Sequence, residues 1–222
     1  MKVYLEIGKK RVFAGAVDWP GWSRAGRDAG AALLALIDSA PRYTAVLHAA
    51  GIEFAPPTTL DDLAVVERLP GTTTTDFGAP DVTPSTDTAP VDEAELARLQ
   101  TLLQAYWQAF DATRQAATGK ELRTGPRGGG RDLDAIVQHV RGAEAGYIAR
   151  LAWKFKADEV ADVEAELQRT RQAALEALAA ASRGELPTRG PRGGVVWMPR
   201  YFARRLGWHV LDHLWEIGDR AS

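Results

Sequence analysis

The sequence predicts an α+β chain with a small α+β module at residues 1–77, a linker at residues 78–91 and an antiparallel four-helix bundle at residues 92–222. Three observations lead to this prediction. Short segments bounded by Gly and Pro alternate between apolar and polar residues in the first part, as strands do. A stretch poor in large apolar residues follows, and beyond it the apolar residues recur with a helical period.

Composition excludes several classes of protein. Hydrophobic residues make up 45% of the 222 residues and charged residues 25%, as in ordinary globular proteins. The longest unbroken apolar run, residues 31–37, is far shorter than the roughly 20 residues of a membrane span, and the charged N-terminal segment is unlike a signal peptide. The lack of cysteine excludes disulfides and thiolate ligands and favours a cytoplasmic protein. A net charge of −2 gives no indication of a nucleic-acid or membrane partner.

The first module begins with a predicted β-hairpin. Apolar and polar residues alternate over residues 3–7, and a second segment covers residues 11–17 after a Gly-Lys-Lys turn. The sequence Asp-Trp-Pro-Gly-Trp at residues 18–22 then predicts a turn, because Pro and Gly favour one.

Two helices and a strand complete this module. Residues 24–39 and 42–50 predict helices, with Pro41 either ending the first or starting the second, and Gly51 ending the second. Residues 63–69 predict one more strand.

The hairpin, the Pro-Gly turn and the Ala-rich helix after it resemble the N-terminal part of HicB-like antitoxin domains. The resemblance covers roughly the first 40 residues and implies a protein partner, since such domains pair with a toxin. The same residues also fit a small capping or dimerising module.

Residues 71–93 hold seven threonines, three prolines and five acidic residues but few large apolar ones. Such a stretch cannot bury a core and predicts a linker. Its first part, residues 72–77, is rich in residues that favour strands, so an edge strand is an alternative there.

Four amphipathic helices are predicted after the linker, over residues 92–118, 133–153, 158–182 and 199–219. Asp132 is a good N-cap for the second, and Pro199 suits the first turn of the fourth. Short connections favour antiparallel neighbours in an up-and-down order.

The sequence Gly-Pro-Arg-Gly-Gly occurs twice, at residues 125–129 and 190–194. An up-and-down order would place both connections at one end of the bundle. Exposed backbone N–H groups with Arg127 and Arg192 could bind an anionic substrate there. Flexible, solvated loops fit the same residues, and the Gly-Lys-Ser/Thr of a phosphate-binding loop is missing.

Histidine is the residue type that indicates a metal site. His209 and His213 are four residues apart on the fourth helix, so both rings can reach one ion. His139 lies about 10 Å past the N-cap of the second helix, and the pair lies about 15 and 21 Å past Pro199. If both helices start from the same end with staggered starts, the three rings could lie level.

Other residues near the triad have smaller predicted roles. Asp212 and Glu216 could orient an imidazole by accepting a hydrogen bond. Trp208 and Trp215 are predicted to be packing groups, and His48 of the first module a structural residue.

The positions of His139, His209 and His213 resemble those of the DinB/YfiT-like superfamily of metalloenzymes, over about residues 92–220. That family has one histidine on the second helix and a His-x3-His pair on the fourth. The resemblance implies a divalent metal (zinc, nickel, iron or manganese), a homodimer, and transferase or isomerase chemistry with a low-molecular-weight thiol.

Three hypotheses for function remain open. The first is a metal-dependent transferase or hydrolase that acts on a small molecule through an external thiol or metal-bound water, since the chain has no cysteine of its own. The second is a non-catalytic protein that senses a ligand or binds a partner through its N-terminal module. The third is a structural dimer with the bundle as interface.

Overall fold

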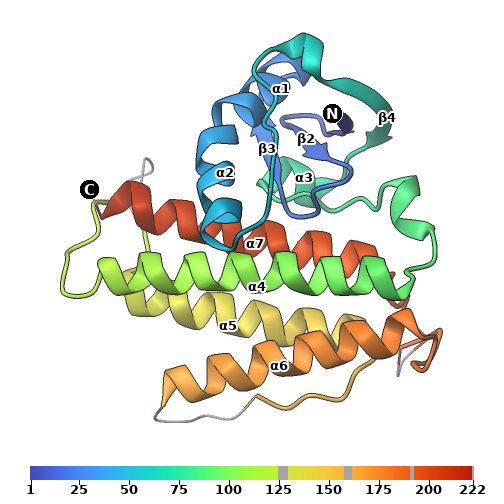
Figure 1. Cartoon of the computed structure of the whole chain (residues 1–222), viewed down its shortest axis with the longest axis vertical. Helices are drawn as coiled ribbons and strands as arrows, with labels where there is room; N and C mark the ends of the chain where they lie inside the picture. Colours follow the sequence, from blue (N-terminus) through green and yellow to red (C-terminus); the bar gives the residue numbers. More distant parts are fainter. Residues whose placement is uncertain (125–129, 158–161, 191–192, 222) are drawn as a thin grey trace.

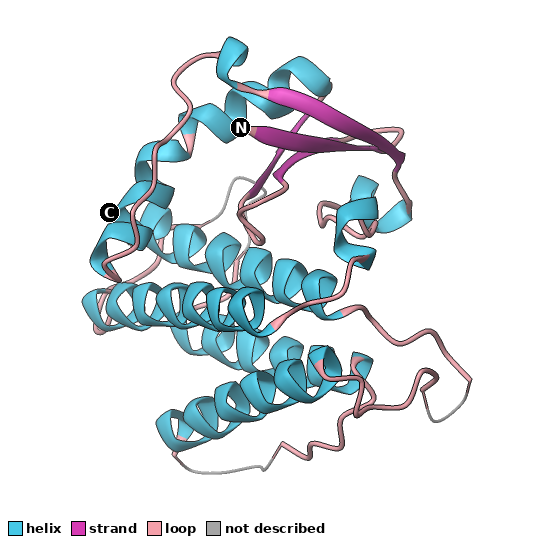
Figure 2. Ribbon diagram, turned by 45° about the vertical axis from the view of Figure 1, so that its right-hand side comes forward, coloured by secondary structure: helices cyan, strands magenta, loops and turns pink. Residues whose placement is uncertain are grey.

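The fold is the predicted α+β arrangement, a mixed sheet followed by four long packed helices (Figure 1). The structure, a computed structural model, describes residues 1–124, 130–157, 162–190 and 193–221. The strands lie on one side of the long helices (Figure 2). Within the described ranges, no helix has both the length and the apolar character that crossing a membrane requires.

The sheet contains four strands in the order β3-β2-β1-β4. Strands β1 (Lys2–Ile7) and β2 (Val12–Ala16) form the predicted antiparallel hairpin. Strand β4 (Ala64–Pro70) confirms the last predicted strand and pairs with β1 in parallel, so the two intervening helices form a crossover connection.

The prediction of a helix from residue 24 is wrong at its start. Ser23–Gly26 forms strand β3 beside β2, and helix α1 (Ala29–Asp38) begins only after Asp28, whose carboxylate accepts a hydrogen bond of 2.8 Å from the Ala31 amide. At Gly26 a Cβ would lie 2.2 Å from the Ala32 amide nitrogen. The backbone at Gly26 therefore packs directly against the first turn of α1, and the strand ends at this glycine.

Helix α2 (Ala40–Ala49) starts with Pro41 in its first turn, so this proline begins the second helix rather than ending the first. A short 3-10 turn (Leu60–Asp62) precedes β4.

Residues 72–77 do not form the edge strand that was the alternative prediction. They form a short helix, α3 (Thr73–Phe77), capped by Thr72. The Thr72 hydroxyl accepts from the Thr74 amide at 3.0 Å, and the Thr75 hydroxyl accepts from the Thr72 amide at 2.7 Å. Hydroxyl caps of this kind explain why threonine, which favours strands, starts a helix here.

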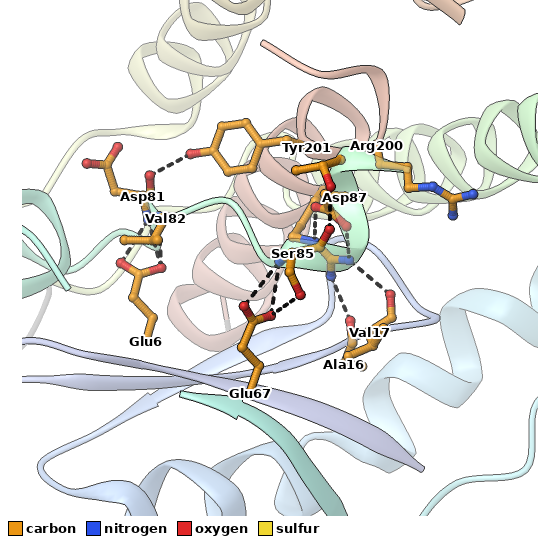
Figure 3. Close-up of polar contacts among 12 residues, drawn as sticks. Glu6, Ala16, Val17, Glu67, Asp81, Val82, Ser85, Asp87, Arg200 and Tyr201 are labelled. Carbon is orange, nitrogen blue, oxygen red and sulfur yellow. Dashed lines mark hydrogen bonds and ion pairs between the residues drawn. The ribbon is translucent and has the colours of Figure 1, made fainter. Parts of the chain in front are cut away.

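Segment 78–91, predicted as a linker, is tied by polar contacts to both the sheet and the helices (Figure 3). The buried Glu6 carboxylate of β1 accepts from the amides of Asp81 and Val82 at 2.9–3.1 Å. The Tyr201 hydroxyl donates to the Asp81 carbonyl at 2.9 Å from the helical side. A second 3-10 turn, Ser85–Thr88, is held to β4 by Glu67, which accepts from the Ser85 amide and hydroxyl at 3.0 Å.

The strongest of these ties is a buried ion pair between Asp87 and Arg204. The guanidinium donates to both carboxylate oxygens at 2.7 and 2.8 Å, and the two residues are 1% and 4% exposed. Its remaining donors reach the carbonyls of Ala16 and Val17 at 2.7 and 2.9 Å. The Arg204 side chain thus joins the last helix to the end of β2 and to segment 78–91.

The four long helices are confirmed, with small shifts at their ends. They are α4 (Glu93–Ala116), α5 (Leu133–Arg150), α6 (Val163–Ser182) and α7 (Pro199–Arg220). Asp132 caps α5 as predicted, accepting from the Ala135 amide at 2.8 Å. Helix α6 begins after the cap Asp162, later than the predicted residue 158, and residues 158–161 lie outside the described part.

The directions of these helices differ from an up-and-down order along the chain. Arg171 of α6 pairs with Asp111 of α4 at 2.6 Å, and Arg114 pairs with Glu164, so α4 and α6 are antiparallel. The start of α6 therefore lies beside the start of α5, and these two helices run in the same direction (Figure 1). A connection from Leu151 to Asp162 carries the chain back along the bundle, which short-loop reasoning did not anticipate.

The Pro-Gly turn of the first module packs between α4 and α7. Gly21 has φ of +100°, and a Cβ there would lie 2.9 Å from the Gly207 carbonyl carbon of α7. The Tyr106 hydroxyl of α4 donates to the Pro20 carbonyl at 2.8 Å. Sheet, turn and long helices consequently contribute to one hydrophobic cluster.

Candidate metal centre

Three histidines from two facing helices lie together inside the bundle. His139 comes from α5, and His209 and His213 come from α7. One nitrogen of each ring lies within 4.8 Å of the others, as the ligands of one metal ion must. His209 and His213 are buried, and His139 is partly exposed, so the cluster is accessible from the side of His139.

The rings lie level because α5 and α7 run in opposite directions. The two helices do not start at the same end, as the sequence argument assumed. Instead, α5 starts where α7 ends, since Arg220 donates to the Arg131 carbonyl at 2.7 Å. His139 is seven residues past the cap of α5 and His213 seven residues before Arg220, so each lies about 10 Å from that shared end.

The geometry of the nitrogens fits a metal ion. The Nε2 atoms of His139 and His209 are 3.2 Å apart. Two nitrogens bound tetrahedrally at about 2.1 Å lie about 3.4 Å apart, close to this separation. The Nδ1 atom of His209 is buried and has no hydrogen-bond partner among the described residues, so the protein orients this ring by packing.

Electrostatics keep the imidazoles in the form that binds metals. Burial lowers the pKa of His209 well below 6.5, and the charges of His213 and Arg205 lower it further. Burial also lowers the pKa of His139, with His213 and Arg131 acting in the same direction. Both rings are therefore neutral at pH 7, with lone pairs free for an ion.

Glu216 orients the third ring. Nδ1 of His213 donates to the Glu216 carboxylate at 2.7 Å, which leaves Nε2 of His213 for the cluster. The hydrogen bond from His213, more than any other factor, lowers the pKa of Glu216 and keeps it ionised. The other carboxylate oxygen accepts from Arg220 at 2.7 Å, and Arg220 is in turn held by the carbonyls of Arg123 and Arg131.

Asp212, the other carboxylate predicted to orient a ring, faces a different partner. It pairs with Arg24 at 3.6 Å, and no hydrogen bond joins it to a histidine within the part of the chain described. His48 lies exposed on α2, away from the cluster. Trp208 and Trp215 are packing groups, with Trp208 edge-on to Phe13 at 6.1 Å.

The loop arginines predicted to bind substrate, Arg127 and Arg192, lie outside the described residues. The described parts of the two connections that contain them lie at opposite ends of the bundle. The amide of Arg123, in the loop after α4, donates to the carbonyl of Arg220 at the end of α7. The amide of Trp197, in the loop before α7, donates to the carbonyl of Arg150 at the end of α5.

Sequence reasoning missed two neighbours of the cluster, Arg205 and Tyr147. The Tyr147 ring lies 5.7 Å from that of His209, edge to face, and the Arg205 guanidinium lies 5.3 Å from the Tyr147 ring. The signal for Arg205 was its position four residues before His209, on the same stripe of the helix. The signal for Tyr147 was its position eight residues after His139.

Three imidazole nitrogens leave coordination positions on a divalent ion open to a further ligand, whereas structural zinc usually has four protein ligands. The cluster could thus hold a metal ion. Comparison of this chain with protein-family models, with curated proteins and with solved structures finds no match.

Proposed function

We propose that this chain binds one divalent metal ion through His139, His209 and His213 and uses it to bind and activate a small molecule. The observation that carries the proposal is the meeting of three imidazole nitrogens within 4.8 Å on facing helices. The arrangement agrees with the resemblance to DinB/YfiT-like metalloenzymes, which places one histidine on the second long helix and a pair on the fourth.

The bound ion would supply Lewis acidity to a ligand atom at its open position. The residues around it have separate tasks. Glu216 fixes the orientation of His213, and burial keeps His139 and His209 neutral. Because the chain has no cysteine, thiol chemistry at this site would need an external thiol. We therefore propose a transferase or hydrolase that acts on a small-molecule substrate.

The alternative, a protein that binds a partner through its N-terminal module, has less support. The turn that carries the HicB-like resemblance is buried, with Pro20 and Gly21 packed between α4 and α7. Pro20 and Gly21 therefore offer no exposed surface to a partner, and the metal site is the better-supported basis of function.

Metal titration tests the proposal directly. Adding zinc or cobalt(II) to metal-free protein is expected to show one equivalent bound, and excess metal at 100 times the Kd should stabilise the fold by about 2.7 kcal/mol. Affinity should fall as the pH is lowered, because protons compete with the ion for the imidazole nitrogens. The lowered pKa values of His139 and His209 shift that competition to lower pH. Calorimetry and thermal unfolding measure both effects. Binding of no metal, or a stoichiometry independent of pH down to 4, would contradict the site.

Replacing Glu216 with Gln is expected to weaken metal affinity about 10- to 100-fold without removing it. The amide can still accept from His213, but it lacks the negative charge that strengthens the ligand and pairs with Arg220. Asp212→Asn is the matched control, since this carboxylate on the same helix pairs with Arg24 instead. Competition with a chelator measures the affinities, and equal losses in the two variants would contradict the role of Glu216.

A further inference from the structure

Arg205 lies one helical turn before His209 on α7 and is held by aromatic rings on two sides. Its guanidinium carbon is 4.6 Å from the centre of the Trp208 ring and 5.3 Å from that of Tyr147. The Tyr147 ring also contacts His209 edge to face. Packing between two rings therefore fixes the cation beside the histidine cluster without an acidic partner.

The guanidinium has an unused hydrogen-bond donor. Nη1 of Arg205 is buried and makes no hydrogen bond, and in the described ranges Arg205 forms no ion pair. Asp212, an acid on the same helix, pairs with Arg24 at 3.6 Å and is 43% exposed at its side chain. A buried donor is almost always satisfied in a native protein, so this one indicates an acceptor supplied from outside the chain.

The neighbouring face of α5 leaves room for such a ligand. Gly142 and Gly146 follow His139 by one and two turns, and a Cβ at either position would meet no atom within 4 Å. Both glycines are exposed, and Tyr147 adjoins the second. The face of α5 that follows His139 therefore carries no side chain at these two positions.

The charge of the site is complementary to an anion. Arg205 and Arg131 both lie close enough to the cluster to affect His209, and Glu216, the carboxylate that accepts from His213, is itself paired with Arg220. A divalent ion would add to this positive charge.

We propose that Arg205 is the substrate-anchoring residue of this site and that the ligand is a small organic carboxylate. The carboxylate accepts from Nη1 of Arg205, and a second donor atom of the same molecule faces the three histidines. Carboxylate suits the guanidinium because it is planar and singly charged. The inference deepens the proposed metal site and rests on it for the second contact only.

Acetate and benzoate are suitable probes, with inorganic phosphate as the competing anion. Titration of the metal-free full-length chain, followed by tryptophan fluorescence and by the side-chain N–H resonances of arginine, is expected to show saturable carboxylate binding. Arg205→Gln should weaken it at least tenfold, and Arg205→Lys should restore part of it. Arg150→Gln is the matched control, because Arg150 also lies over a ring, that of Trp197 at 5.8 Å, but away from the cluster.

A variant with a bulkier side chain and a titration of metal-loaded protein distinguish the carboxylate inference from the proposed metal site. Gly146→Leu is expected to block benzoate while cobalt(II) binding persists. In cobalt(II)-loaded protein the carboxylate should also alter the visible absorption of the ion. Failure of cobalt(II) to bind would overturn the metal site alone, because the metal-free titration still tests Arg205. Wild-type affinity in Arg205→Gln, or tighter binding of phosphate than of benzoate, would overturn the carboxylate inference.

Discussion

Replacing His209 with Ala is expected to abolish stoichiometric metal binding while the chain stays folded. His209 is the central member of the cluster: its Nε2 lies 3.2 Å from Nε2 of His139, and its ring centre is 4.6 Å from that of His213. The loss should exceed the 10- to 100-fold effect expected of Glu216→Gln, because a ligand atom is removed rather than reoriented. Elemental analysis of the purified variant and calorimetry measure it.

The fold should tolerate this substitution because the His209 ring makes no hydrogen bond to the protein outside the cluster, and its Nδ1 is buried without a partner. Circular dichroism of metal-free wild type and variant should therefore agree. His48→Ala is the control, since it removes an exposed histidine from α2 and should leave one equivalent bound. One equivalent of metal retained by His209→Ala would exclude the histidine cluster as the site.

The triad could be predicted because its information is local. Two histidines four residues apart share a helix face whatever the rest of the fold does, and His139 follows an N-cap that the sequence identifies. The comparison of positions along the helices selected the three histidines that cluster, but it assumed the wrong helix directions. It assumed that α5 and α7 start from the same end, whereas their opposite directions make His139 and His213 level.

Helix direction was not predictable from loop length. The connection from Leu151 to Asp162 is long enough to carry the chain back, so α6 runs parallel to α5. The described parts of the connections before α5 and before α7 therefore lie at opposite ends of the bundle. Arg205 was missed for a related reason. Its value to the site depends on the packing of Tyr147 and Trp208 against it and on its unbonded Nη1. The spacing of residues along α7 predicts neither feature.

The predicted linker shows the limit of composition as a guide. Residues 78–91 contain few large apolar side chains, and the prediction that they add little to a hydrophobic core follows from that. Composition does not report polar partners elsewhere in the chain. Asp87 pairs with Arg204, which is 117 residues away in the sequence, and Glu6 accepts from the amide of Val82, which is 76 residues away. These contacts form only once sheet and helices are in place.

Arg204→Met is expected to destabilise the protein by about 3–5 kcal/mol, the usual cost of leaving a buried charge without its partner. The substitution leaves the Asp87 carboxylate, which is 1% exposed, without its ion-pair partner. It also removes the hydrogen-bond donors of the Ala16 and Val17 carbonyls at the end of β2. Arg200→Met is the matched control on the same helix. Its pair with Glu95 is partly exposed, at 26% and 18%, so its loss should cost about 0–1 kcal/mol.

A second variant separates the charge from the packing. Combining Arg204→Met with Asp87→Leu removes the stranded carboxylate and should recover part of the stability, but not all of it, because the carbonyls of Ala16 and Val17 stay without donors. Urea unfolding of the single and double variants gives the free energies of unfolding and their coupling. Equal costs for Arg204→Met and Arg200→Met would show that the buried pair does not hold segment 78–91 between sheet and bundle. A double variant less stable than Arg204→Met would show that the carboxylate stabilises the fold without its arginine.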